Sequence, residues 1–336
     1  MSEIQYQSIL TVSDVAIGYK NKNALLPIAE NISLEIYKGE MVCLLGPNGC
    51  GKSTLIRTLA GMQPTLAGTI TIDGDDIHTM NLESLAKKMS VVLTDGVNVP
   101  NMTVFDIVAL GRYPHTNWFG TLSQTDVEVV RSAMEKVGLE GFDNRDFQQL
   151  SDGEKQRAMI AKALAQDTPF IMLDEPTAHL DLPNRVEVIR LLKTLARTTY
   201  KSILLSTHEL DLALQVSDRI WLMQKDKPMQ CGTPEDLVLN GSFERAFKKQ
   251  SFDFDISNGL FKINYDYHKK ISVSGDAVRT FWTIRALHRH GIAVCEAQEG
   301  IPHIIASNDV WTIVSDQGNQ QCQSIFELLS ALSGLK

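Results

Sequence analysis

The chain has 336 residues, of which 43% are hydrophobic and 21% charged, and its formal net charge at pH 7 is -8. This length suits one large and one small domain, and the acidic excess excludes a broad electrostatic attraction to nucleic acid, so we expect no nucleic-acid partner. The chain has no run of about 20 apolar residues, no signal-peptide pattern at its start and five singly scattered cysteines, which predicts an intracellular protein with reduced thiols.

A glycine-rich loop follows the apolar run 41–45. It fits the pattern Gly-x-x-x-x-Gly-Lys-Ser, and its predicted nucleotide-binding residues are Gly46, Pro47, Asn48, Gly49, Cys50, Gly51, Lys52, Ser53 and Thr54. The glycines let backbone N–H groups face inward, and the following helix directs its positive end at the same point, so both favour phosphate. We expect Lys52 to reach the β- and γ-phosphates and Ser53 to give a hydroxyl to Mg²⁺. The alternative is a glycine-rich turn without a ligand.

The next segments predict further strands and then a helical insertion. Asp73-Gly74 predicts a hairpin turn after the strand 69–72, because both residue types accept the backbone of a tight turn. A mixed sheet is expected around the glycine-rich loop, and a helical insertion is expected over about residues 96–165, before strand–helix units resume.

A pair of carboxylates ends the apolar strand that begins at Phe170. Asp174 and Glu175 follow this strand directly, at the place where sheets of α/β proteins hold their chemistry. We expect Asp174 to hold Mg²⁺ and Glu175 to polarise an attacking water. The alternative is that the pair caps the next helix.

Three more segments identify a family by their order and spacing. Residues 150–157, 177–181 and 206–209 resemble the signature loop, the D-loop and the switch-histidine loop of ATP-binding-cassette (ABC) proteins. The resemblance covers about residues 8–245. It implies an α/β fold of the ABC-type P-loop ATPase class, with a RecA-like core, a β-subdomain and a helical subdomain over about residues 96–165.

The resemblance also implies a head-to-tail dimer that holds two ATP molecules between its subunits. Ser151 and Gly153 would then offer a hydroxyl, amides and a helix N-terminus to the γ-phosphate held by the second copy. His208 would sense that phosphate as a catalytic residue beside Glu175, and Asp181 would couple the two sites. Tyr19 lies where these proteins place a ring against adenine, although it also fits an ordinary strand-edge residue.

One position departs from the family pattern. Thr94-Asp95-Gly96 stand where most of these proteins carry a glutamine that contacts Mg²⁺ and relays to a membrane partner. Asp95 or Thr94 offers an oxygen ligand instead, so we include Asp95 among the candidate metal ligands with Ser53 and Asp174.

The run Gly-Arg-Tyr-Pro-His at residues 111–115 resembles the ATPases of importers for iron–siderophore, haem and vitamin B12. In that resemblance the segment receives a helix of the permease. Without the family, residues 102–115 predict an amphipathic helix that ends in a proline turn, with Arg112 and His115 in solvent.

Cys50 lies inside the glycine-rich loop, close to a helix N-terminus and to Lys52. Both features lower the pKa of a thiol, which predicts a reactive cysteine whose modification blocks ATP binding. The alternative is that this position only tolerates a small side chain.

We expect one domain over residues 1–250 and a second, small α/β domain over residues 251–336. Strands are predicted near 260–264, 271–274, 292–296, 301–307 and 310–315, with helices at 277–290 and 322–332. This domain could regulate turnover, strengthen the dimer or bind a ligand.

The sequence therefore predicts an ATPase subunit, with ATP and Mg²⁺ as cofactors, that drives uptake of a metal chelate. Its expected partners are a second copy, an integral-membrane permease and, indirectly, a substrate-binding protein, and its expected location is the cytoplasmic face of the cell membrane. Two alternatives stay open: a soluble ABC ATPase, for example in iron–sulfur assembly, and an ATP-binding regulatory module with little turnover.

Overall fold

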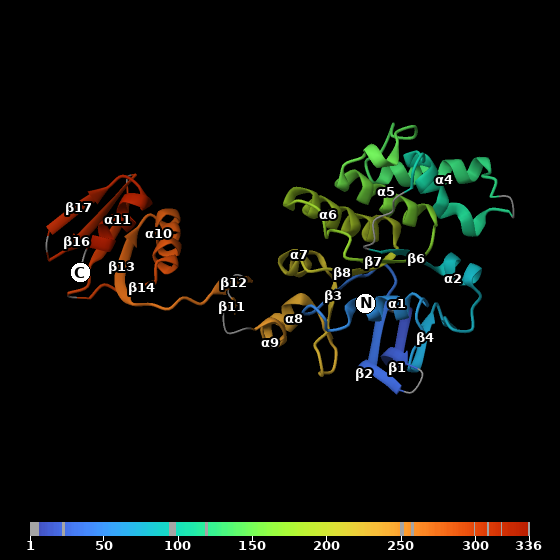
Figure 1. Cartoon of the computed structure of the whole chain (residues 1–336), viewed down its shortest axis with the longest axis horizontal. Helices are drawn as coiled ribbons and strands as arrows, with labels where there is room; N and C mark the ends of the chain where they lie inside the picture. Colours follow the sequence, from blue (N-terminus) through green and yellow to red (C-terminus); the bar gives the residue numbers. More distant parts are fainter. Residues whose placement is uncertain are drawn as a thin grey trace, which may run out of the picture. The chain divides into compact units, whose positions relative to one another are not determined.

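The computed structural model describes residues 7–21, 24–93, 99–117, 120–248, 252–256, 259–298, 300–307, 309–316 and 318–334. The chain divides into two units, residues 1–248 with 256–259, and residues 249–255 with 260–336. Figure 1 shows the elements of each.

A six-stranded sheet lies at the centre of the first unit, in the order β10-β9-β3-β8-β7-β6. β9, β3, β8, β7 and β6 are paired in parallel, whereas β10 pairs antiparallel with β9. Every residue of β3, β7 and β8 is buried, as parallel strands covered on both faces require, and this explains their continuous apolar runs. The strands are β3 (Met41–Leu45), β6 (Met89–Val92), β7 (Phe170–Asp174), β8 (Ser202–Ser206), β9 (Arg219–Leu222) and β10 (Gln230–Gly232).

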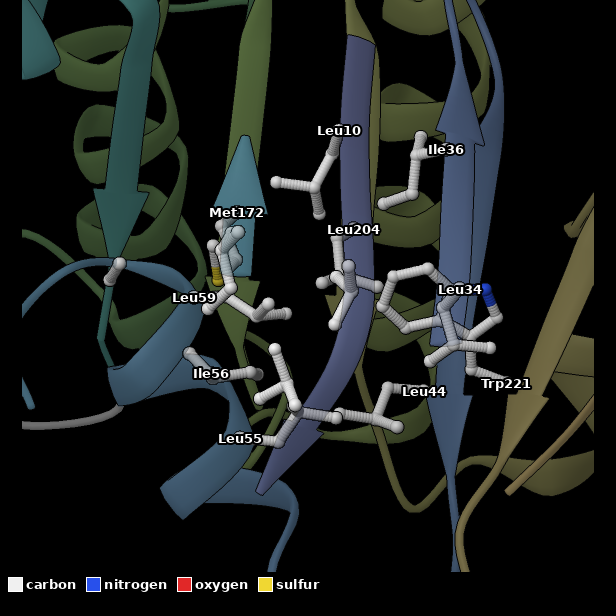
Figure 2. Packing of buried hydrophobic residues seen from close by; sticks show 14 of the residues in the cluster. Leu10, Leu34, Ile36, Leu44, Leu55, Ile56, Leu59, Met172, Leu204 and Trp221 are labelled. Carbon is white, nitrogen blue, oxygen red and sulfur yellow. The ribbon is translucent and has the colours of Figure 1, made fainter. Parts of the chain in front are cut away.

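Helices and a second, antiparallel sheet cover this centre. The second sheet has the order β2-β1-β4-β5, with β1 (Ser8–Asn21), β2 (Ala24–Tyr37), β4 (Ala67–Ile72) and β5 (Asp75–Asp76). The helices are α1 (Lys52–Leu59), α2 (Leu82–Lys88), α6 (Leu182–Thr199), α7 (Leu210–Val216), α8 (Pro234–Leu239) and α9 (Ser242–Phe247). One apolar cluster joins both sheets to α1, and Figure 2 shows part of it, including Leu10, Ile36, Leu55, Leu59, Met172, Leu204 and Trp221.

The predicted hairpin turn is confirmed. β4 and β5 pair through Ile72 and Asp75, which leaves Asp73 and Gly74 as the two turn residues. Both have positive φ, 49° and 84°, as the tight two-residue turn that matches the strand twist requires.

The chain between β6 and β7 forms the predicted helical insertion, with α3 (Val104–Ala109), the 3-10 helix η1 (Leu110–His115), α4 (Gln124–Lys136), the short 3-10 helix η2 (Phe147–Gln149) and α5 (Asp152–Ala165). In α3, α4 and α5 the residue before the helix and the third residue within it bond reciprocally, which satisfies N–H groups left free at a helix start. Figure 1 shows α4 and α5 on the side of the central sheet away from β1, β2 and β4.

Arg112 holds these helices together, which corrects the alternative that placed it in solvent. Its side chain is buried, Nε donates to Oδ1 of Asp126 at 2.8 Å, and Nη1 donates to the carbonyl of Ala165 at 2.8 Å. Hydrogen bonds from Ser123 and the guanidinium of Arg112 lower the pKa of the Asp126 carboxyl to about 2. Gly111 allows this approach, because a Cβ there would lie 2.2 Å from the carbonyl of Lys162.

The second unit is a small α/β structure. Its sheet has the order β14-β13-β15-β16-β17, and a separate hairpin joins β11 (Phe252–Asp255) to β12 (Leu260–Ile263). The sheet strands are β13 (Lys269–Gly275), β14 (Ile292–Cys295), β15 (His303–Ser307), β16 (Val310–Ser315) and β17 (Gly318–Cys322), with helices α10 (Ala277–Arg289) and α11 (Ile325–Gly334). Leu287 of α10 and Leu328 of α11 join the same apolar cluster as Ile304 and Ile313 of the sheet.

One expectation for this unit is wrong. Residues 318–322 form the edge strand β17, so the closing helix begins at Ile325 and not at Cys322. Backbone pairing with β16 makes this strand, and its side chains are exposed apart from Cys322. The side-chain pattern therefore carried no strand signal.

We predict that Asp126→Ala destabilises the first unit strongly. The change removes one reciprocal helix-start bond and also leaves the Arg112 guanidinium buried without its carboxylate, a situation that costs about 3 kcal/mol or more. Urea unfolding followed by circular dichroism at neutral pH measures the loss.

Asp106→Ala is the matched control. Asp106 makes the same reciprocal bonds with Thr103, is exposed, and has no arginine among its described partners. This change should cost about 1 kcal/mol. Equal losses for the two variants would show that the buried ion pair does not hold the helices together.

Candidate functional site

The glycine-rich loop connects β3 to the first turn of α1. Gly46 is required, because a Cβ there would lie 2.2 Å from the carbonyl oxygen of Met223. Gly49 and Gly51 have φ of 78° and 111°, conformations that suit glycine, and Gly51 directly precedes the helix. The first turn of α1 contains no acidic residue. The helix N-terminus therefore stays electropositive, and residues 46–54 form a site with the physical character that an anion needs.

Lys52 closes this loop on itself. Its Nζ donates to the carbonyl oxygens of Gly46 at 2.8 Å and of Pro47 at 3.4 Å, and only 5% of the residue is exposed. Burial lowers the pKa of the Lys52 ammonium, whereas the negative groups Glu175 and Asp174 raise it.

The two carboxylates lie at the end of β7, next to the end of β8. Asp174 pairs with Ser206 in parallel register, and 5% of Asp174 is exposed. Burial raises the pKa of the Asp174 carboxyl, while the neighbouring Ser206 and Ser53 hydroxyl groups lower it. This contact brings the predicted metal ligands Ser53 and Asp174 together, although more than a hundred residues separate them.

Glu175 and His208 form a direct pair. Nε2 of His208 donates to Oε1 of Glu175 at 2.6 Å, and the backbone N–H of Glu175 donates to the carbonyl of Ser206 at 3.0 Å. Glu175 has a φ of 49°, a left-handed conformation that is uncommon for glutamate and that clusters at functional sites. The parallel pairing of β7 and β8 thus places a carboxylate and an imidazole side by side at the edge where Lys52 lies.

The signature segment packs against the start of α6, directly after the D-loop. Ser151 precedes α5, and its hydroxyl donates to Glu154 at 2.8 Å. A Cβ on Gly153 would lie 2.7 Å from Oδ1 of Asn184, so this glycine permits close packing against α6. Asp181 accepts bonds from the backbone N–H and the side chain of Asn184 at 3.1 and 2.6 Å. Sequence reasoning missed Asn184, whose only signal was its position three residues after Asp181.

Tyr19 lies on β1 beside the start of α1. Its hydroxyl is 3.4 Å from Oγ1 of Thr54, and 52% of the residue is exposed. An exposed ring next to the glycine-rich loop is available to stack on a planar ligand. Thr94 and Asp95 lie outside the described residues, so the substitution of the family glutamine stays a prediction.

The prediction that Cys50 is a reactive thiol with a lowered pKa is wrong. Burial raises the pKa of the Cys50 thiol, and this effect outweighs the lowering by Lys52 and by backbone hydrogen bonds. Only 3% of the residue is exposed. Cys50 therefore acts as a small packing residue of the loop, in line with the alternative stated for it.

Tyr113 has a different environment from Arg112. It is 75% exposed and borders a cleft of about 260 Å³ on the helical insertion. The other lining residues are Met102, Phe105, Asp106, Ala109, Leu110, Thr116, Gly120 and Leu122. The run Gly-Arg-Tyr-Pro-His thus contains one residue that holds the helices together and one that faces outward beside an apolar cleft.

Two family profiles match the chain. The profile described as "ABC transporter" matches residues 29–178, and that described as "Iron ABC transporter C-terminal domain" matches residues 268–333. An ABC transporter ATP-binding protein of Methanocaldococcus jannaschii is 36% identical over 267 residues, covering 79% of this chain and 91% of that protein. Among the described residues, no helix is long and apolar enough to cross a membrane.

Two relatives with named activities are similar over most of their length. The petrobactin import ATP-binding protein FpuC of Bacillus anthracis is 34% identical, covering 81% of this chain and 93% of that protein. The iron(3+)-hydroxamate import ATP-binding protein FhuC of Bacillus subtilis is 33% identical, covering 71% and 88%.

Solved structures give the same fold. A metal-chelate type ABC transporter in an inward-facing conformation aligns with a TM-score of 0.62 at 27% identity, covering 72% of this chain and 89% of that chain. A dimeric ABC transporter cassette aligns with a TM-score of 0.59 at 25% identity, covering 67% and 98%. The α/β fold predicted from the sequence is therefore confirmed.

We predict that Asp174→Asn raises the melting temperature in the absence of ligands. Because burial raises the Asp174 pKa, the folded state binds the proton more tightly than the unfolded state, and the charged form costs stability at neutral pH. The gain of a few degrees should be present at pH 7 and should shrink as the pH falls through the raised pKa of Asp174, because the carboxyl then takes up a proton in the folded state.

Asp181→Asn serves as the control, because asparagine caps a helix as well as aspartate does and Asp181 is exposed. Its melting temperature should match that of the unmodified protein. A lower melting temperature for Asp174→Asn at neutral pH would contradict the assigned cost of burial.

Proposed function

Since this chain belongs to the ABC transporter ATP-binding protein family, we propose that it hydrolyses ATP to drive import of a metal chelate, an iron–siderophore, haem or cobalamin complex. The relatives named for petrobactin, iron-hydroxamate, achromobactin and cobalamin import support this substrate class. The match of residues 268–333 to an iron transporter C-terminal domain favours an iron complex among these. The family binds nucleotide, and a related cassette is known with ADP and Pi.

The site at the shared edge of β3, β7 and β8 carries the proposal. It joins a phosphate-binding loop, a lysine, two carboxylates and an imidazole, and the 2.6 Å bond between His208 and Glu175 is its central contact. A loop that only bound nucleotide would not need this pair. The combination suits hydrolysis of a phosphoanhydride.

Each residue has a defined part in this hydrolysis. Lys52 exchanges the carbonyls of Gly46 and Pro47 for β- and γ-phosphate oxygens, and the loop N–H groups bind the same phosphates. Glu175 accepts a proton from the attacking water, and His208 holds its carboxylate in place. Tyr19 offers its exposed ring to adenine.

The oxygen donors Ser53 and Asp174 fit Mg²⁺, because a hydroxyl and a buried carboxylate that contact each other are hard ligands of the kind this ion prefers. When bound by Ser53 and Asp174, Mg²⁺ would supply positive charge to the phosphates. Asp95 is kept as a further proposed ligand. At neutral pH a bound Mg²⁺ would also offset the cost of burying the Asp174 charge.

We place a second copy of the chain opposite this site. Ser151 and Gly153 start α5 and, in a head-to-tail dimer, would meet the phosphates bound to the partner, with Asp181 close to the interface. The similarity to a dimeric cassette supports this arrangement. In this dimer, Ser151 would exchange its hydrogen bond to Glu154 for a phosphate oxygen.

The remaining proposed partners are a membrane permease and a substrate-binding protein that delivers the chelate. The exposed Tyr113 and its cleft offer an apolar surface for a helix of the permease. These partners would place the protein on the cytoplasmic face of the cell membrane. The second unit, residues 249–255 and 260–336, has a proposed regulatory role.

We predict that Glu175→Gln lowers ATP turnover by about 100-fold or more, because it removes the base and keeps the shape. ATP binding should persist within a few-fold. Steady-state phosphate release and nucleotide binding by fluorescence measure the two quantities.

Glu235→Gln on the exposed surface of α8 is the control and should leave turnover unchanged. Persistent turnover in Glu175→Gln would reject the assigned base. Lack of turnover in the unmodified protein reconstituted with its permease would instead favour the regulatory module.

We predict that Tyr113→Ala weakens assembly with the permease by about tenfold or more, because a large exposed aromatic beside an apolar cleft is a typical interface anchor. Affinity purification of the permease with the ATPase measures this loss. Leu239→Ala, which removes a 77% exposed residue on α8, should co-purify normally. Equal yields of permease with both variants would show that the permease binds a different surface.

A further inference from the structure

Arg185 connects two loops of the site that are far apart in sequence. It lies in α6, four residues after Asp181, and its side chain returns toward the start of the helix. Nε donates to the carbonyl oxygen of Leu180 at 2.6 Å, and Nη1 donates to Oε1 of Glu209 at 2.7 Å. Leu180 belongs to the D-loop, and Glu209 directly follows His208. One planar guanidinium thus joins both loops.

Each loop has a short path to Glu175. On one side, His208 bonds the Glu175 carboxylate, and the neighbouring Glu209 N–H donates to Oγ1 of Thr207 at 3.0 Å, which fixes the turn after β8. On the other side, the N–H of Ala178 donates to the carbonyl of Glu175 at 3.1 Å, at the start of the turn that leads to Leu180. Arg185 closes a ring of contacts that contains Glu175 and His208.

The placement of Arg185 is unfavourable for the helix alone. A cation in the first turn opposes the helix dipole, and the Asp181 carboxylate that caps α6 bonds to Asn184. The Glu209 carboxylate supplies a negative charge in direct contact with the guanidinium, and the pair is partly buried, with side-chain exposures of 35% and 24%. Arg185 therefore reaches its charge partner only when the turn after β8 is correctly placed, and its bond to the Leu180 carbonyl only when the D-loop is.

We propose that Arg185 is a positioning residue that couples the D-loop to His208. A shift of the D-loop pulls on the Leu180 carbonyl, and the rigid guanidinium passes this shift to Glu209 and so to the imidazole beside it. Lysine cannot replace this function fully, because its ammonium is a point charge on a flexible stem and lacks the planar fork. The proposal rests on the ATPase function proposed above, since its effect is exerted on the Glu175–His208 pair.

The kinetic test compares Arg185→Met with Arg190→Met, a change of an exposed arginine on the same helix. Arg185→Met should lower kcat by about tenfold or more and change KM for ATP less than about twofold, because the phosphate loop is untouched. Arg185→Lys should recover part of the lost kcat. Arg190→Met should behave as the unmodified protein.

A double variant tests the path through Glu209. Glu209→Gln alone should slow turnover less than Arg185→Met does, since Arg185 keeps its bond to Leu180. Combining both changes should add nothing to the effect of Arg185→Met, because the two residues act through one contact. Additive losses would overturn the coupling.

Hydrogen exchange without nucleotide separates this proposal from the proposed function. The N–H groups of Leu180 and Glu209 are both hydrogen-bonded, so their exchange reports on the two loops. Arg185→Met should speed exchange in peptides covering both, and Glu209→Gln should speed it in the D-loop, which Glu209 reaches through Arg185. Unchanged exchange in both loops, or a kcat within about twofold of the unmodified protein at equal thermal stability, would overturn the proposal. Absence of turnover in the unmodified protein would refute the ATPase function, while the exchange result would still decide whether Arg185 couples the loops.

Discussion

Parallel pairing of β3, β8 and β7 brings three segments that are far apart in sequence to one edge of the central sheet. The glycine-rich loop follows β3, the carboxylates end β7, and His208 follows β8. Because the carboxyl ends of parallel strands share an edge, one sheet brings Lys52, the two carboxylates and His208 close together. The apolar cluster between the two sheets and α1 keeps this edge in position.

The cost of this arrangement is the burial of charge. Lys52 and Asp174 are nearly inaccessible to solvent. Burial lowers the pKa of Lys52 and raises that of Asp174, which favours the neutral form of each group. A folded protein gains little stability from such groups, so their presence suits a site that binds a charged ligand such as nucleotide. Arg112 and Asp126 show the contrasting case, since their charges pair within the chain and hold the helical insertion together.

The second unit buries a small apolar cluster of its own. In its helix α10, some of the apolar residues are buried and others are exposed. Leu287 and Ala286 pack against the sheet, whereas Val278, Phe281 and Trp282 on the same helix are more than half exposed. The periodicity that predicted the helix therefore included residues that do not contribute to the core. Arg285 lies over the rings of both Phe281 and Trp282, which partly covers their faces.

The sequence alone determined the elements whose signals are local. The glycine pattern at residues 46–54, the carboxylates after an apolar strand, the Asp73-Gly74 turn and the helical insertion were all predictable, because each depends on backbone freedom, charge or periodicity within a short segment. Tertiary structure decided what depends on distant neighbours. Arg112, expected in solvent, is buried and bonds Asp126. Burial also raises the pKa of Cys50, which the nearby Lys52 alone would lower. Backbone pairing made β17 without an apolar pattern, and only the packing of α6 against the turn after β8 brought Arg185 to Glu209. These outcomes depend on which groups the fold brings close and removes from water, which no single segment encodes.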